Sequence, residues 1–106
     1  MMPRPLISAC FAILLFTTPA AAQDFREGLR AFQRGENEQA VTIFRDLAAR
    51  NDRDAQFMMG VMREGGYGIE KNLVEAANWY LMAAEAGLPS AQFNLGIFYQ
   101  LGQGVR

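Results

Sequence analysis

The sequence contains no histidine and only one cysteine, Cys10, near the start of the chain. It therefore lacks the imidazole needed for histidine acid–base catalysis, for Ser-His and Cys-His nucleophiles and for the common zinc sites. Serine is nearly absent too, since only Ser90 follows Ser8, and no base lies near it in the sequence. These absences do not exclude catalysis by carboxylates alone. The Asp and Glu residues, however, lie at expected helix starts and in loops, where solvated carboxylates are common. These absences predict a chain that is not an enzyme and that holds neither cofactor nor metal.

The charges of the chain are nearly balanced. Lys and Arg number 10 against 11 Asp and Glu, which gives a formal net charge of −1. A surface that binds phosphates needs an excess of basic residues, so nucleic acid is not an expected partner. Because Cys10 lies in the expected leader, the rest of the chain has no disulfide. A small exported domain without disulfides must be stabilised by the packing of its own side chains or by contacts with neighbouring domains or proteins.

The first 22 residues have the pattern of a secretory signal peptide. Arg4 precedes an apolar run from Leu6 to Phe16, and Ala20 and Ala22 supply the small-x-small pattern of a cleavage site. The run is too short to span a membrane and fits a secretory h-region. The alternative is an uncleaved anchor or a buried helix. We expect cleavage after Ala22 and a mature chain that is periplasmic or secreted, with no stable membrane span.

A repeat with a period of 36 residues is the strongest signal in the sequence. The segment DAQFMMGVMREGGYGIE aligns without a gap with SAQFNLGIFYQLGQGVR, 36 positions later. A weaker copy lies upstream, where EQAVTIFRDLAAR has an apolar stripe at helical spacing that VEAANWYLMAAEAG repeats. A period in the thirties is typical of stacked helix pairs.

Apolar periodicity and capping signals predict five helices, near residues 24–34, 37–50, 54–64, 72–86 and 89–101. Asn72 with Glu75 resembles a capping box. Gly87 suits a helix C-terminus, and Pro89 suits the first turn of the next helix. The segment Asn51–Asp54 resembles the start of a calcium loop, but the glycine and distal glutamate are missing, so a helix cap is favoured. The predicted fold class is all-α, an α-solenoid of antiparallel helix pairs.

Residues 54–106 carry A-x-x-x-[L/M]-G, a G-x-G-[V/I] loop and A-x-x-W-Y-x-x-A-A-x-x-G. This order is similar to the Sel-1-like repeat, a longer-looped relative of the tetratricopeptide repeat. Arg63 departs from it, because the family usually has an aromatic there, as at Tyr99.

The resemblance implies about two and a half repeats after the leader. Residues 23–53 look like a tetratricopeptide-like helix pair, residues 54–88 like one Sel-1-like repeat, and residues 89–106 like the first helix and loop of a truncated one.

A second apolar stripe runs along the first helix of each predicted pair. In tetratricopeptide relatives the first helices line the concave surface, so the resemblance implies a groove for a peptide or a partner protein. The alternative is that these residues pack one repeat against the next, as any solenoid requires. The candidates for partner binding are Phe25, Leu29, Phe57, Met58, Val61, Phe93, Asn94 and Ile97.

Two functions follow from the resemblance. The first is a non-catalytic interaction or scaffold module of the cell envelope, which binds a peptide or partner protein on its repeat surface. The second, implied by a disulfide-rich secreted branch of the family, is a cell-wall-linked or β-lactam-binding protein with weak hydrolase activity. The missing histidine and paired cysteines argue against the second.

The repeated sequence stops at Arg106, after the first predicted helix and the loop of a further repeat. On the last helix we expect an uncovered apolar stripe of Leu95, Phe98, Tyr99 and Leu101. Three outcomes are open: the chain is a fragment of a longer repeat protein, it self-associates through this face, or its last helix frays. The break inside a motif favours the fragment.

Overall fold

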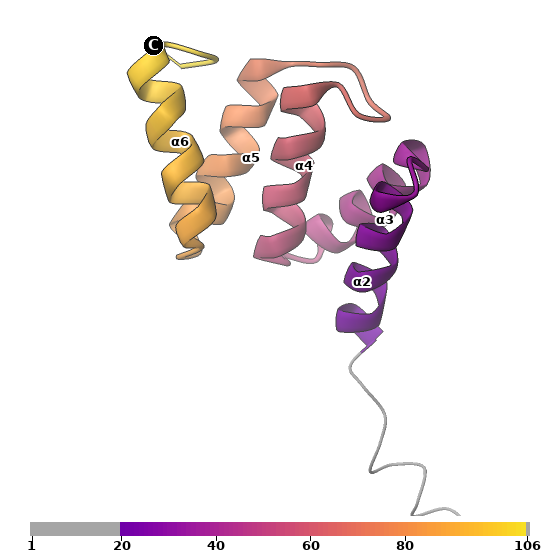
Figure 1. Cartoon of the computed structure of the whole chain (residues 1–106). Coiled ribbons are helices and arrows are strands. Elements are labelled where there is room, and N and C mark those ends of the chain that lie inside the picture. The colour runs from indigo at the N-terminus through magenta and orange to yellow at the C-terminus, as the bar shows by residue number, and fades with distance from the viewer. Residues whose placement is uncertain (1–19, 106) are drawn as a thin grey trace, which may run out of the picture.

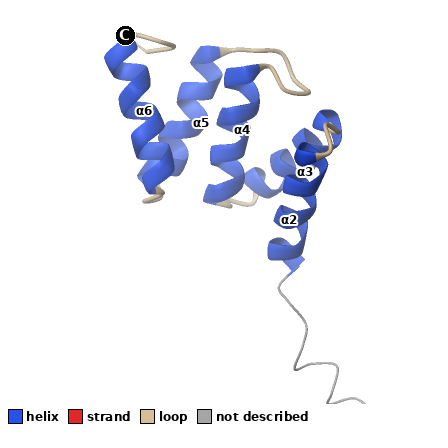
Figure 2. Cartoon of the chain, viewed as in Figure 1, coloured by secondary structure: helices blue, strands red, loops and turns tan. Residues whose placement is uncertain are grey.

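The computed structural model describes residues 20–105, so residues 1–19 of the expected signal peptide lie outside the described part. Within that part the chain forms five α-helices and no strand (Figure 2). They are α2 (Ala20–Gln33), α3 (Asn37–Ala49), α4 (Arg53–Gly65), α5 (Leu73–Glu85) and α6 (Pro89–Leu101) (Figure 1). The predicted all-α class and the five predicted helices are confirmed, although α2 begins earlier than expected and runs through the expected cleavage position.

Each helix packs against the next one along the chain. The contacting pairs are α2 with α3, α3 with α4, α4 with α5, and α5 with α6. Figure 1 shows α4, α5 and α6 standing side by side, with the α2–α3 pair at the other end of the row. This stepwise stacking is the architecture of a helical solenoid, in which each unit contacts only its neighbours. None of the described helices has the length and apolar character that a membrane crossing requires.

The start of α4 is fixed by a side-chain cap. One carboxylate oxygen of Asp52 accepts hydrogen bonds from the backbone N–H groups of Asp54 and Ala55, at 3.0 and 3.1 Å. These bonds satisfy donors that the first turn of a helix leaves without a partner. The segment Asn51–Asp54 is therefore a helix cap, and no group of acidic, cysteine or histidine side chains among residues 20–105 could hold a metal ion.

The start of α5 is fixed by Asn72 and by an ion pair. The side-chain oxygen of Asn72 accepts from the backbone N–H of Glu75 at 3.0 Å. The Glu75 carboxylate forms an ion pair with Arg63, in which Oε2 lies 2.9 Å from Nε. The Arg63 guanidinium also donates a hydrogen bond of 3.0 Å to the backbone carbonyl of Glu70. Arg63, the residue that departs from the family pattern, thus ties α4 to the following loop and to α5.

Two groups of buried side chains hold the helices together. The first joins α2, α3 and α4 through Ala31, Ala40, Val41, Phe44, Leu47, Ala48, Ala55, Met58, Met59 and Met62. The second joins α5 and α6 through Ala76, Ala77, Tyr80, Leu95 and Phe98. The expected uncovered stripe on α6 is therefore wrong for Leu95 and Phe98, which α5 covers, whereas Tyr99 and Leu101 are exposed.

The G-x-G-[V/I] loops dock onto the second helix of the preceding unit. Gly68 and Gly104 have positive φ angles of 69° and 63°. Gly68 lies against the backbone of Asn37 at the start of α3, and Gly104 lies against Leu73 at the start of α5. A side chain at either glycine would overlap that backbone and would strain the φ angle. The two loops therefore explain why the repeat contains this motif.

Candidate functional site

The first helices of the two helix pairs, α2 and α4, each carry a glycine on the face where the second helix, α3 or α5, packs. A Cβ added at Gly28 would lie 2.6 Å from the ring of Phe44, and one added at Gly60 would lie 2.5 Å from the ring of Tyr80. Both distances are far below van der Waals contact, so only glycine lets these rings lie against the helix backbone. The pairing of α2 with α3 and of α4 with α5 thus depends on the same contact.

A phenylalanine one turn before each glycine completes the contact. The rings of Phe25 and Phe44 are 5.5 Å apart, and those of Phe57 and Tyr80 are also 5.5 Å apart. We use the term glycine seat for this pair of positions on a first helix. The three glycine seats are Phe25 with Gly28 on α2, Phe57 with Gly60 on α4, and Phe93 with Gly96 on α6.

The glycine seat on α6 is uncovered. Apart from its two chain neighbours and the backbone of α6 itself, a Cβ added at Gly96 would meet no heavy atom of the described residues within 4 Å. Phe93 is 69% exposed, whereas its counterparts Phe25 and Phe57 are partly buried against the two cores. The same two residue types therefore have different surroundings on α6 from those on α2 and α4.

The predicted partner-binding residues fall into separate environments. Phe25 and Phe57 face the second helices of their own pairs, and Leu29 packs against the first core. Met58 is buried in that core, and Val61 packs partly against the second. Contacts between helices therefore account for much of the burial of these five side chains, which is the packing alternative that the sequence left open.

The remaining three candidates lie on α6. Phe93 belongs to the uncovered glycine seat, while Asn94 and Ile97 are half-buried. Asn94 lines an open, solvent-facing pocket of about 320 Å³ between α4, the following loop, α5 and α6. Its lining residues are Val61, Glu64, Gly65, Tyr67, Tyr80 and Asn94. We call this cavity the α4–α6 cleft; it brings together two of the predicted residues, Val61 and Asn94.

A buried tyrosine forms the polar centre of the α4–α6 cleft. The Tyr80 hydroxyl donates a hydrogen bond of 2.6 Å to Glu64 Oε1. Burial, and then this hydrogen bond, raise the pKa of Tyr80 above its ordinary value, although the amide of Asn94 acts in the opposite direction. The hydroxyl therefore remains protonated at physiological pH and remains a donor to Glu64.

The α4–α6 cleft presents both apolar and polar groups to solvent. Val61 and the half-exposed ring of Tyr67 provide apolar surface, while Glu64 provides an acceptor and Asn94 both a donor and an acceptor. The repeat pattern predicted Val61 and Asn94 but missed Glu64 and Tyr67. The sequence could have indicated Glu64 as a residue that faces α5, because it lies four positions after Gly60 and therefore on the same face of α4.

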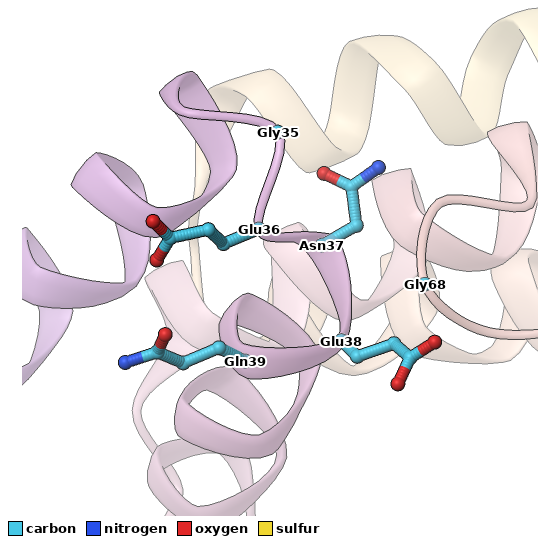
Figure 3. Close-up of a pocket in the computed structure, with 6 residues that line it drawn as sticks. All are labelled: Gly35, Glu36, Asn37, Glu38, Gln39 and Gly68. Carbon is cyan, nitrogen blue, oxygen red and sulfur yellow. The ribbon is translucent and has the colours of Figure 1, made fainter.

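A second pocket, of about 450 Å³, lies at the turn between α2 and α3. It is lined by Gly35, Glu36, Asn37, Glu38, Gln39 and Gly68. Figure 3 shows that its side chains diverge, with Glu36 and Gln39 extending to one side and Glu38 to the other. Glu36 is also paired with Arg34, at 3.1 Å. We interpret this pocket as the place where the loop of Gly68 docks on α3, not as a ligand site.

Family comparison supports the repeat interpretation. The Sel1 repeat profile matches residues 53–88 and 89–106, which together make up about half of the chain. The chain belongs to the Sel1 repeat family. Sel1-repeat proteins are generally protein-interaction modules and typically non-enzymatic scaffolds. The resemblance predicted from the G-x-G-[V/I] loop and the helix patterns is confirmed.

Solved structures of Sel1-type proteins share the fold. A protective antigen present in uropathogenic Escherichia coli strains, which displays an SLR fold, superposes with a TM-score of 0.76 at 37% identity; the match covers 81% of this chain and 19% of that one. A Sel1 repeat protein from Oxalobacter formigenes superposes with a TM-score of 0.71 at 41% identity, covering 76% of this chain and 33% of that one. The solenoid of helix pairs is thus confirmed.

Curated relatives match over shorter stretches. The chitin synthase regulator SKT5 of Saccharomyces cerevisiae is 60% identical over 36 residues, which are 34% of this chain and 5% of that protein. A putative sel1-like repeat-containing protein of Acanthamoeba polyphaga mimivirus is 37% identical over 62 residues, 58% of this chain and 12% of that protein. The Sel1 chain described here therefore spans only a small part of the length of these relatives.

Proposed function

We propose that this Sel1-repeat chain is a non-catalytic interaction or scaffold module of the cell envelope. It binds a peptide or a partner protein on the surface of its helical repeats. The observation that carries the proposal is the α4–α6 cleft, where Val61 and Tyr67 lie beside the polar groups of Glu64 and Asn94. An apolar wall with a few placed polar groups is the usual composition of a recognition pocket.

The size and charge of the α4–α6 cleft indicate what it would hold. A cavity of about 320 Å³ is at the lower end of ligand pockets and suits one or two side chains of a partner. The Glu64 carboxylate accepts hydrogen bonds, so the bound segment should present backbone N–H groups or a basic side chain. Asn94 can pair with either a donor or an acceptor, as a peptide backbone offers.

The cleft can be tested by photo-crosslinking in exporting cells. Tyr67 is replaced by benzoylphenylalanine, which resembles it in shape and lies at the cleft. We expect irradiation to give a discrete adduct of the full chain with one partner, because the ring at Tyr67 borders the bound segment. Replacing Asn94 with alanine should weaken this adduct several-fold, since a recognition group is lost.

Asn78 supplies the control position for that experiment. It is exposed on α5, away from the α4–α6 cleft. Benzoylphenylalanine at Asn78 should give no adduct with that partner. Equal adducts from the two positions, or none from Tyr67, would contradict binding in the cleft.

The location in the cell envelope rests on the leader. We expect the exported protein to begin at Gln23, because Ala20 and Ala22 form a small-x-small cleavage pattern after the apolar run. Intact-mass measurement of the protein from the envelope fraction checks this. Replacing Ala22 with arginine is the control and should leave the leader attached. An exported wild-type chain that retains Met1 to Ala22, or that is acylated at Cys10, would be inconsistent with the prediction.

A further inference from the structure

The side of α5 that faces solvent carries an apolar patch. Val74, Leu81 and Met82 are 57%, 39% and 44% exposed, and Asn78 lies among them. Because an α-helix has 3.6 residues per turn, these four side chains share one face of α5, opposite to its buried side. We call these four residues the α5 face. Exposed apolar side chains that are grouped in this way, unlike scattered ones, indicate an interaction surface.

The preceding helix pair shows that the α5 face belongs to the outer surface of the solenoid. The positions 36 residues earlier, on α3, are exposed although α4, α5 and α6 follow α3; they are Glu38, Thr42, Arg45 and Asp46. A helix pair that continued the solenoid beyond α6 in the same way would therefore leave the α5 face in solvent. The α3 positions are all polar, so the repeat itself does not require apolar residues there.

One charged side chain lies at each end of the α5 face. Lys71 precedes the N-cap of α5, and Glu85 is its last residue. Both are exposed, and neither forms an ion pair within residues 20–105. Their signs are the reverse of those that the helix dipole favours, so the helix itself does not account for them. Lys71 lies seven residues before Asn78 and Glu85 lies seven residues after it, which makes the face complementary to its own reverse.

We infer that the α5 face is the interface of a symmetric dimer of this chain. A twofold axis through Asn78 makes two α5 helices run antiparallel and brings identical faces together. It places Lys71 of each copy beside Glu85 of the other, and Val74 of each copy beside Met82 of the other. At the centre, the two Asn78 amides can exchange hydrogen bonds, which fixes the register of the two helices.

The twofold axis also accounts for the fourth member of the α5 face. Leu81 lies three residues after Asn78, and Glu75 lies three residues before it, so the axis brings Leu81 of one copy beside Glu75 of the other. The Glu75 carboxylate is held by Arg63 of its own chain, so its methylene groups are left to contact Leu81. A membrane surface is a poorer occupant, because anionic lipids would repel Glu75 and Glu85.

The dimer should be weak, and it is separate from the α4–α6 cleft. One helix face buries less than the roughly 1,600 Å² of a standard interface, so we expect a dissociation constant on the order of 100 μM. The residues of the α5 face do not line the cleft. The inference therefore does not rest on the proposed function.

Sedimentation velocity of the full chain, below and above the expected dissociation constant, provides the first test. We expect a monomer–dimer equilibrium for the wild-type chain. Met82→Glu should weaken association at least about tenfold, because it places a charge against Val74 of the other copy. The substituted side chain is exposed in the monomer, so the variant should fold, and circular dichroism checks this. A wild-type chain that is still monomeric at millimolar concentration would overturn the inference.

Charge reversal tests the pairing at the two ends. Lys71→Glu or Glu85→Lys alone places like charges together and should weaken association by about three- to tenfold. The double variant contains the reversed pair and should recover most of the wild-type affinity. Effects confined to one chain would not recover in this way, since the two residues lie at opposite ends of α5. A double variant that associates no better than either single variant would contradict the proposed pairing.

Oxidation of an Asn78→Cys chain tests the position of the axis. Facing Cα atoms on antiparallel helices about 8–10 Å apart lie within reach of a disulfide. In a Cys10→Ser background we expect a disulfide-linked dimer from Asn78→Cys and none from Thr42→Cys, the matched position on α3. Equal linkage of the two variants would show that the axis does not pass through Asn78.

Phe93→Ser on α6 separates the α5 face from other exposed apolar surface. Phe93 is more exposed than any member of the α5 face, but it lies on another helix. Its replacement should leave the sedimentation behaviour unchanged. A dimer that Phe93→Ser abolishes and Met82→Glu does not would place the interface on α6 and refute the inference.

Discussion

Replacing Tyr80 with alanine is expected to lower the free energy of unfolding by about 3–5 kcal/mol. The side chain is fully buried at the junction of α4, α5 and α6. Its ring lies on Gly60, 5.5 Å from the ring of Phe57 and 5.4 Å from the ring of Phe98 in an edge-to-face arrangement. Alanine would leave a cavity where three helices meet and would remove the hydrogen bond to Glu64. Urea unfolding followed by circular dichroism measures the loss.

Leu81 supplies the control for that prediction. It is the next residue on α5 but points outward and is 39% exposed. Leu81→Ala should cost about 1 kcal/mol, because more than a third of its surface is already in water and it belongs to neither group of buried side chains. If Tyr80→Ala lowered the free energy of unfolding no more than Leu81→Ala, Tyr80 would not be the side chain that joins the helices.

Replacing Gly60 with alanine is expected to lower the free energy of unfolding by about 1–3 kcal/mol. In an exposed helix the same change would raise stability by up to about 1 kcal/mol, because alanine has the higher helix propensity. Here the new methyl group would lie 2.5 Å from the Tyr80 ring. That ring cannot move away easily, since Phe57, Phe98 and Glu64 hold it on its other sides. Thermal and urea unfolding of the variant both report the loss, and an unchanged or raised stability would show that the ring yields.

The sequence predicted the helices well because their signals are local. Apolar spacing marks the buried face of each helix, and Asp52, Asn72, Gly87 and Pro89 mark helix ends through their own backbone and side-chain chemistry. The structure shows the caps of Asp52 and Asn72 and the positive φ angle of Gly87. The repeat spacing also paired Gly60 with Gly96 correctly, since both lie on equivalent faces of first helices.

The sequence could not show which neighbour covers each face. Leu95 and Phe98 formed an apparently uncovered stripe, yet the packing of α6 on α5 buries them. Met58 belonged to a supposed binding stripe, yet it lies in the core between α3 and α4. Which helix buries a given side chain depends on the angle at which two helices cross and on the direction in which the loop between them turns. The apolar pattern of one helix does not contain that information.

The candidate site was predictable only in part for the same reason. Val61 and Asn94 could be named because the 36-residue period places them on corresponding first helices. The bond from Tyr80 to Glu64, which gives the α4–α6 cleft its polar centre, joins residues on two different helices. It becomes visible only when those helices are packed. Partner binding by the eight named residues stays a prediction, as does the removal of the leader.

The free energy of unfolding of Gly96→Ala, compared with that of Gly60→Ala, tests the central claim most directly. The claim is that the glycine seats of this Sel1-repeat chain are covered by α3 on α2 and by α5 on α4, whereas no part of residues 20–105 covers the seat on α6. Gly96 has no described neighbour near its missing side chain, so alanine there should raise the free energy of unfolding by up to about 1 kcal/mol. Gly60→Ala should lower it. A Gly96→Ala chain that loses stability as Gly60→Ala does would contradict the account, because the seat on α6 would then already be filled.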